Sequence, residues 1–242
     1  MSNEFIQYEL NDGIATITID DGKRNALSPA VLAELHHAFE RAALDNAAVI
    51  LTGREGVFSA GFDLKVMGRG GKHAIGMLGA GYALPAKVMA HPKPVIVACN
   101  GHSFAMGVFL MLSADYVIGS RGDFKISANE VAIGMTMPRV AAAMLKHKLT
   151  PSAYQRAVTL AEQFDVDSAK AAGFFDEVVE PHELMERATA LANNLLQLDD
   201  HSHKVSKRRI RRKLIWQTRL SIPLDLADAA LIGFRRAKAK KA

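Results

Sequence analysis

The stretch PVIVACNGHSFAMGVFLMLSADYVIG, residues 94–119, followed by SRGDFKISANEVAIGMTMP, residues 120–138, decides how this chain folds. Residues 94–99 form a short run rich in Val and Ile, which predicts a buried strand. Asn100-Gly101 is typical of a tight turn. The apolar run 108–112 is too continuous for a surface helix. We therefore expect a strand that leads directly into a buried helix.

This arrangement predicts a place for a negatively charged oxygen. The first N–H groups of a helix have no intrahelical partner, and together with the helix dipole they attract anions. One ionisable residue, Glu130, follows a short distance along the chain in otherwise apolar sequence. An oxyanion site with a carboxylate beside it is the minimum needed to move protons next to a carbonyl group.

Composition narrows the class of protein. A chain of 242 residues with 49% hydrophobic and 23% charged residues has the profile of a soluble globular protein with a sizeable core. The single cysteine, Cys99, lies in the predicted strand, so no disulfide can form within the chain, which fits a reducing compartment. We find no secretory signal and no apolar run of about 18 residues that could cross a membrane. These features predict a cytoplasmic protein.

The positive charge is concentrated near the C-terminus. The net charge is +5, and residues 204–219 hold eight basic residues and no acidic one; residues 235–241 are basic again. One interpretation is a solvated helix face with a frayed tail. The others are an anchor for phosphate groups of a ligand and nonspecific contact with nucleic acid. Because no aromatic residue beyond Trp216 is interleaved with these charges, we do not expect nucleic acid as the partner.

The order of the remaining segments predicts an α/β core followed by helices. Residues 5–10 and 14–19 alternate around Asn11-Asp12-Gly13 and predict a hairpin. Ser28-Pro29 predicts the start of a helix that ends near residue 44, a strand follows at 48–52, and Asp63 is expected to cap the next helix. Residues 68–81 are rich in glycine, and we expect them to be mobile. Further helices are expected at 82–90, 139–148, 152–160, 167–172 and 181–198, a strand at 174–179, and a helical, basic remainder from 201.

Five segments resemble the crotonase superfamily, also called the enoyl-CoA hydratase/isomerase family. They are KRNALSPAVLAEL (23–35), LTGREGVFSAGFDL (51–64), KPVIVACNGHSFAMG (93–107), ADYVIG (114–119) and NEVAIGMTMP (129–138). The resemblance implies a ClpP/crotonase-like spiral of β-β-α turns over residues 1–198. It also implies a helical trimerisation or lid region over residues 199–242 and a homotrimer or hexamer. The implied ligand is an acyl-CoA thioester, with neither a further cofactor nor a metal.

The resemblance also assigns candidate site residues. The backbone N–H groups of Phe62 and Met106 would form the oxyanion hole, although Ala105-Met106-Gly107 replaces what is often a run of three glycines. Glu130 matches the later of two family glutamates and would be the catalytic base. The residues that would contact CoA are Lys23, Arg24, Ala26, Ala60, Gly61, Asp63 and Leu64.

The missing carboxylate distinguishes between two family reactions. Hydratases of the family use an earlier glutamate as well, and this position holds Phe109, which cannot transfer a proton. A single carboxylate can still move a proton from C2 to C4 of a 3-enoyl thioester while the oxyanion hole holds the enolate. The sequence therefore favours a Δ3-Δ2-enoyl-CoA isomerase over an enoyl-CoA hydratase that works with one glutamate.

Two alternatives lie outside this chemistry. Gly101-His102-Ser103-Phe104-Ala105 nearly fits the nucleophile elbow of serine hydrolases, with Ser103 as nucleophile and with Asp165 or Asp176 and His182 following in the required order. The last glycine of that motif is absent. The chain could also bind acyl-CoA without catalysis, or bind RNA through its basic C-terminal segment.

Overall fold

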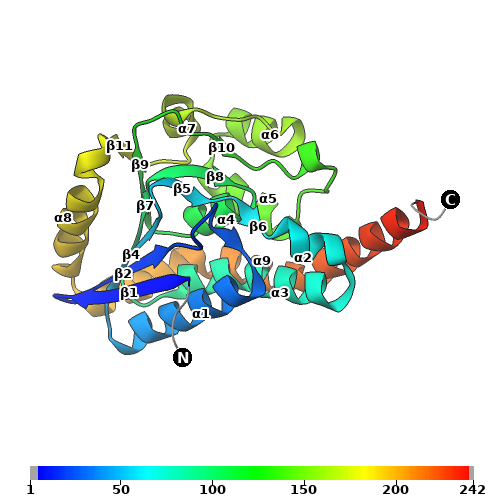
Figure 1. Ribbon diagram of the computed structural model, residues 1–242. Coiled ribbons are helices and arrows are strands. Elements are labelled where there is room, and N and C mark those ends of the chain that lie inside the picture. Colours follow the sequence, from blue (N-terminus) through cyan, green and yellow to red (C-terminus); the bar gives the residue numbers. More distant parts are fainter. Residues whose placement is uncertain (1–4, 240–242) are drawn as a thin grey trace.

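A computed structural model describes residues 5–239 and contains one large twisted sheet (Figure 1). Its strands lie in the order β1 (Ile6–Asn11), β2 (Ile14–Ile19), β4 (Ala48–Gly53), β7 (Val95–Cys99), β9 (Tyr116–Ser120) and β11 (Glu177–Val179). The β1–β2 pair is antiparallel, as the hairpin prediction required, and the other neighbours are parallel.

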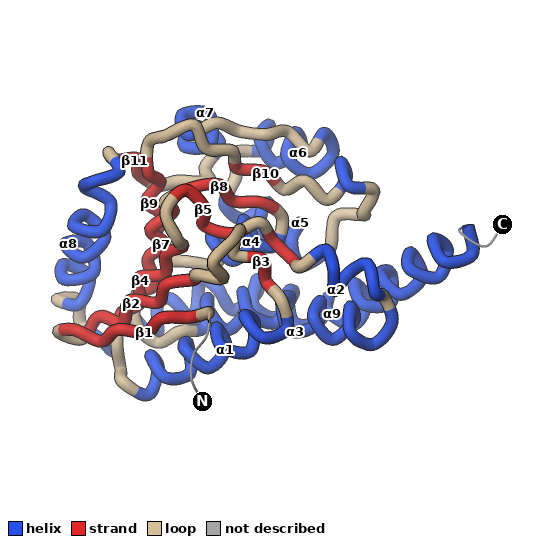
Figure 2. Tube along the Cα trace, viewed as in Figure 1, coloured by secondary structure: helices blue, strands red, loops and turns tan. Residues whose placement is uncertain are grey.

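Helices cover both faces of this sheet, which explains why its central strands β4 and β7 are almost continuously apolar. Every residue of β4 is buried. Val49 and Leu51 face the main core, whereas Ile50 packs with residues of α8 (Leu184–Leu196) on the opposite face. Figure 2 shows α8 on one side of the red strands and α1 (Pro29–Leu44), α3 (Gly71–Ala90) and α9 (Asp200–Ala239) on the other.

The local sequence predicted none of the strands of a second, smaller sheet. This sheet contains three parallel strands in the order β10 (Ile126–Ser127), β8 (Gly101–Phe104) and β5 (Gly56–Ser59). The expectation that residues 94–99 lead directly into a helix is therefore wrong, because β8 intervenes before α4 (Met106–Leu112). Gly101 permits this, since a Cβ there would lie 2.0 Å from the carbonyl carbon of Gly56. A short pair, β3 (Ala26–Leu27) with β6 (Gly61–Phe62), completes the β structure.

The segment 68–81, which we expected to be mobile, is largely helical. Within it, α2 (Leu64–Arg69) ends and α3 begins, joined through Gly70 and Gly71, which both have positive φ. Ala74, Leu78 and Tyr82 recur every four residues and are all buried. Burial of this stripe outweighs the helix cost of glycine, about 1 kcal/mol per residue.

The other helices agree closely with the sequence. Ser28 accepts a hydrogen bond from the Val31 N–H at the start of α1, and Asp63 caps α2 in the same way. The later helices are α5 (Arg139–Lys148), α6 (Pro151–Leu160) and α7 (Val166–Ala172), with short 3₁₀ turns at Val131–Ile133 and Pro181–Glu183. Within residues 5–239, no helix is both long and apolar enough to cross a membrane.

The basic C-terminal segment is partly structural. Lys207 and Arg211 of α9 are buried, and both pair with Asp115, at 2.5 and 3.1 Å. Arg211 also donates to the carbonyl oxygens of Ser113 and Ala114, next to the end of α4. Two of the eight basic residues therefore bind inside the chain rather than to a phosphate or nucleic acid. Side chains beyond Gly233, including the basic tail 235–241, lie outside the part of the chain that can be described.

We predict that Asp115→Ala lowers the free energy of unfolding by about 3–5 kcal/mol, because it leaves two buried cations without their shared carboxylate. Urea unfolding at pH 7 and one protein concentration measures this loss. Asp123→Ala is the matched control, since its side chain is 97% exposed and should cost about 0.5 kcal/mol or less. A loss below about 1 kcal/mol for Asp115→Ala would contradict the structural role of this cluster.

Candidate active site

The three residues proposed for catalysis follow the same edge of the small sheet. Phe62 comes three residues after β5, Met106 two residues after β8, and Glu130 three residues after β10. Because these strands are parallel, their carboxyl ends meet at one edge, which is where α/β proteins commonly bind ligands. The sheet therefore brings together residues that lie far apart in the sequence.

Gly61 allows the first two of these segments to approach closely. A Cβ at Gly61 would lie 2.9 Å from the Phe104 carbonyl oxygen and 3.3 Å from the Met106 nitrogen. Its φ of +82° also lies in the region that favours glycine. The peptide that precedes Phe62 is thus placed beside the first residue of α4.

The start of α4 is locally strained. Ala105 has a φ of +49°, although it carries a Cβ, and its N–H is held by the Ser127 carbonyl oxygen at 2.9 Å. Residues in this region cost roughly 1–3 kcal/mol and persist where the surroundings fix them. Met106, the first residue of α4, is fully buried, and its N–H has no intrahelical acceptor.

Glu130 is a buried carboxyl group that forms no ion pair with any described side chain. It is 4% exposed, and its Oε2 has no hydrogen-bond partner among the described residues. Burial raises the pKa of Glu130 from 4.5 to about 7, partly offset by a hydrogen bond from its own backbone. Near neutral pH this carboxyl group can therefore both accept and release a proton.

Tyr82 of α3 connects Phe62 with Glu130, and the sequence analysis missed it. Its ring meets the Phe62 ring edge-on with 5.7 Å between centroids. Burial raises the pKa of Tyr82, and the negative charges of Asp225 and Glu130 raise it further, so both carboxyl groups lie near the phenol. The helical spacing from Ala74 and Leu78 to Tyr82 was the signal that could have placed it on the buried face.

The candidate CoA-binding residues come from two segments that the β3–β6 pair brings together. Ala26 pairs with Gly61, and the Ala60 N–H donates to the Arg24 carbonyl oxygen at 3.0 Å. The side chains of Lys23, Arg24 and Leu64 are exposed, whereas the Asp63 carboxylate is occupied as the cap of α2.

The serine-hydrolase arrangement is not assembled. Ser103 lies inside β8 rather than at a turn, and its buried hydroxyl has no partner among the described residues. Asp165 instead caps α7, and Asp176 accepts the Val117 N–H. The described residues also contain no group of three His, Cys, Asp or Glu side chains that could hold a metal ion.

Comparisons with known proteins show the family of this chain. Residues 9–222 match the family model described as enoyl-CoA hydratase/isomerase. A probable enoyl-CoA hydratase, echA17, of Mycobacterium avium is 31% identical over 85% of this chain and 82% of its own length.

Two solved structures extend this similarity. An enoyl-CoA hydratase/isomerase family protein from Pseudomonas syringae superposes with a TM-score of 0.91 at 42% identity, over 93% of this chain and 98% of that one. The apo structure of an enoyl-CoA isomerase of Mycobacterium tuberculosis superposes with a TM-score of 0.88 at 41% identity, over 94% of this chain and 99% of that one. Because the family model covers most of its length, the chain belongs to the enoyl-CoA hydratase/isomerase family, and it has the crotonase fold.

Proposed function

We propose that this chain is a Δ3-Δ2-enoyl-CoA isomerase with Glu130 as its single proton carrier. The observation that carries the proposal is one buried carboxyl group whose Oε2 has no partner among the described residues and whose pKa is raised to about 7 by burial. Phe109, at the position of the family's earlier glutamate, is 1% exposed and part of the apolar core, so it supplies no second proton carrier.

The proposed reaction uses these groups in a fixed order. The Phe62 and Met106 N–H groups donate to the thioester oxygen, which makes the C2 proton more acidic. The Glu130 carboxylate removes that proton, and negative charge spreads from the oxygen over the conjugated system. Glu130 then returns the proton to C4, leaving the double bond between C2 and C3. Neither water nor a second carboxyl group takes part.

Hydration of 2-enoyl-CoA with Glu130 alone is the second candidate function. It is favoured by the relative from M. avium, which is named a probable hydratase. The relative from M. tuberculosis is named an isomerase in one solved structure and a probable enoyl-CoA hydratase in another, so its names favour neither reaction. The two reactions differ in substrate and product, so activity measurements separate them. We also propose that the protein is cytoplasmic. We further propose that its chain divides into a core over residues 1–198 and a trimerisation or lid region over residues 199–242.

We predict that the purified protein converts 3-hexenoyl-CoA to 2-hexenoyl-CoA faster than it hydrates 2-hexenoyl-CoA. We expect Glu130→Gln to reduce kcat for isomerisation by about 10²–10⁴-fold, because the amide cannot exchange the proton. For the unchanged chain, kcat/KM should rise with pH to a plateau, with a midpoint near 7. Chromatography of the two products makes the comparison. Fast hydration without isomerisation would reverse the assignment, and no turnover with intact CoA binding would indicate a non-catalytic acyl-CoA binder.

The same variant should stabilise the fold at high pH. Unfolded Glu130 titrates near 4.5 and the folded residue near 7, so the folded state loses stability as pH rises between these values. Glu130→Gln removes this loss, and its free energy of unfolding should exceed that of the unchanged chain by up to about 3 kcal/mol at pH 8. The difference should shrink toward pH 5, as measured by urea unfolding. Equal differences at pH 5 and pH 8 would exclude a buried, titrating Glu130.

We further propose that the chain forms a homotrimer or hexamer through α9. Trp216, Leu220 and Leu224 recur every four residues along this helix, and their exposed fractions are 64, 64 and 55%. Such a stripe on one helix face is typical of a surface that another protein covers.

Light scattering should therefore give three or six times the chain mass of 26.2 kDa. Trp216→Glu combined with Leu220→Glu should lower that mass, because the charges oppose burial of the stripe. Gln217→Glu adds charge at an exposed neighbouring position and should leave the mass unchanged. A monomer in the unchanged chain would refute the assembly.

A further inference from the structure

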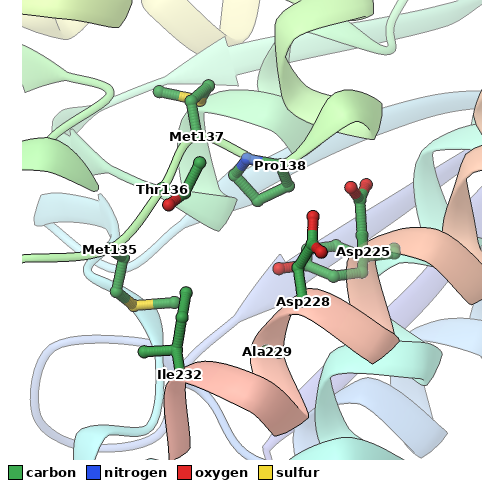
Figure 3. Close-up of a pocket in the computed structure, with 9 residues that line it drawn as sticks. Met135, Thr136, Met137, Pro138, Asp225, Asp228, Ala229 and Ile232 are labelled. Carbon is green, nitrogen blue, oxygen red and sulfur yellow. The ribbon is translucent and has the colours of Figure 1, made fainter. Parts of the chain in front are cut away.

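A small cavity, partly open to solvent, lies between α3, α9 and the loop that follows Glu130; the empty space in and around it, open solvent included, is about 300 Å³. Tyr82 of α3 and loop residues 135–138 line it on one side, and Asp225, Asp228 and Ile232 of α9 on the other. Figure 3 shows these α9 side chains opposite Thr136, Met137 and Pro138.

This cavity adjoins the candidate active site. The Met135 N–H donates to the Glu130 carbonyl oxygen at 2.8 Å, so the cavity wall starts within one turn of the proposed base. Tyr82 belongs to both places, because its ring packs against Phe62 and it also lines the cavity. An acyl chain whose thioester oxygen lies at the Phe62 N–H could therefore extend along Tyr82 into this space.

The Tyr82 hydroxyl points to a ligand in the cavity. Tyr82 is only 2% exposed, and none of the described residues forms a hydrogen bond with its hydroxyl. The hydroxyl is not one of the fully buried polar atoms, so it reaches the surface of the cavity that Tyr82 lines, where a ligand group can contact it. Burial and the charges of Asp225 and Glu130 raise its pKa, so the hydroxyl stays protonated.

The charged side chains at the cavity carry more negative than positive charge. Asp225 is saturated: it accepts the N–H groups of Arg139 and Val140, at 2.9 and 3.0 Å, and also the Arg139 guanidinium. Asp228 pairs with the same guanidinium at 2.7 Å, and its side chain is 48% exposed. Two carboxylates thus share one cation, and Asp228 retains accepting capacity.

We propose that this cavity receives the far end of the acyl group and selects acyl chains that end in a hydrogen-bond donor, a hydroxyl or an ammonium group. The Asp228 carboxylate and the Tyr82 hydroxyl accept from that donor, whereas a terminal carboxylate is repelled. This inference rests on the proposed function, because Phe62 and Met106 must hold the thioester for the chain to point this way.

The test measures binding, so it needs no turnover. Calorimetric Kd values are compared for saturated CoA thioesters of six and eight carbons that end in methyl, hydroxyl, ammonium or carboxylate. At one or both lengths we expect hydroxyl or ammonium thioesters to bind about tenfold more tightly than methyl thioesters. The carboxylate thioesters should bind more weakly than the methyl ones. The hydroxyl and ammonium arms show which donor is preferred.

Variants locate the source of the preference. Asp228→Asn should reduce the preference for ammonium over methyl to about twofold, and Tyr82→Phe should reduce the preference for hydroxyl. Asp123→Asn is the matched control at an exposed carboxylate outside the cavity, and it should leave every Kd ratio unchanged. Equal Kd values for all ends at both lengths, or a preference that survives both Asp228→Asn and Tyr82→Phe, would overturn the proposal. Selective binding without isomerisation would instead contradict only the proposed function.

Discussion

The close packing of β5 against β8 is the constraint on which the candidate site depends. Gly101 lies so near to the backbone of Gly56 that any side chain would displace one strand from the other. A side chain is also excluded at Gly107 of α4, since a Cβ there would lie 2.8 Å from the carbonyl oxygen of Ser59 at the end of β5. Without these contacts, the segments that carry Phe62 and Met106 would lie farther apart.

The cost of the site is concentrated at two residues. Ala105 holds a backbone conformation that favours glycine, and Glu130 is a buried carboxyl group without an ion pair to any side chain that the structure describes. Both features oppose folding, and the extensive core on the two faces of the large sheet offsets them. Locally unfavourable geometry of this kind is common where proteins hold reactive groups in place.

Helix α9 contacts several distant parts of the structure along its length. Its first half inserts Lys207 and Arg211 beneath α4, where they pair with Asp115. Farther along, Asp225 accepts the first N–H groups of α5 and so caps that helix from outside. The same helix then supplies a wall of the cavity beside Tyr82. The sequence of α9 is typical of a basic surface helix, but the face that carries these residues packs against the rest of the chain and supports the fold.

The sequence by itself determined the hairpin and most helices, because glycines, caps and apolar runs act over short distances. The resemblance of five of its segments gave the family and supplied the candidate residues. Ser28 and Asp63 cap the helices that their local sequence predicts. The tertiary structure decided what depends on distant neighbours. Strand β8 needs Gly56 beside it, and α3 tolerates its glycines because its apolar face is buried. The positions of Tyr82, Asp225 and Asp228 around one cavity likewise depend on how α3 and α9 pack, because residues about 140 positions apart in the printed sequence meet only when the chain folds.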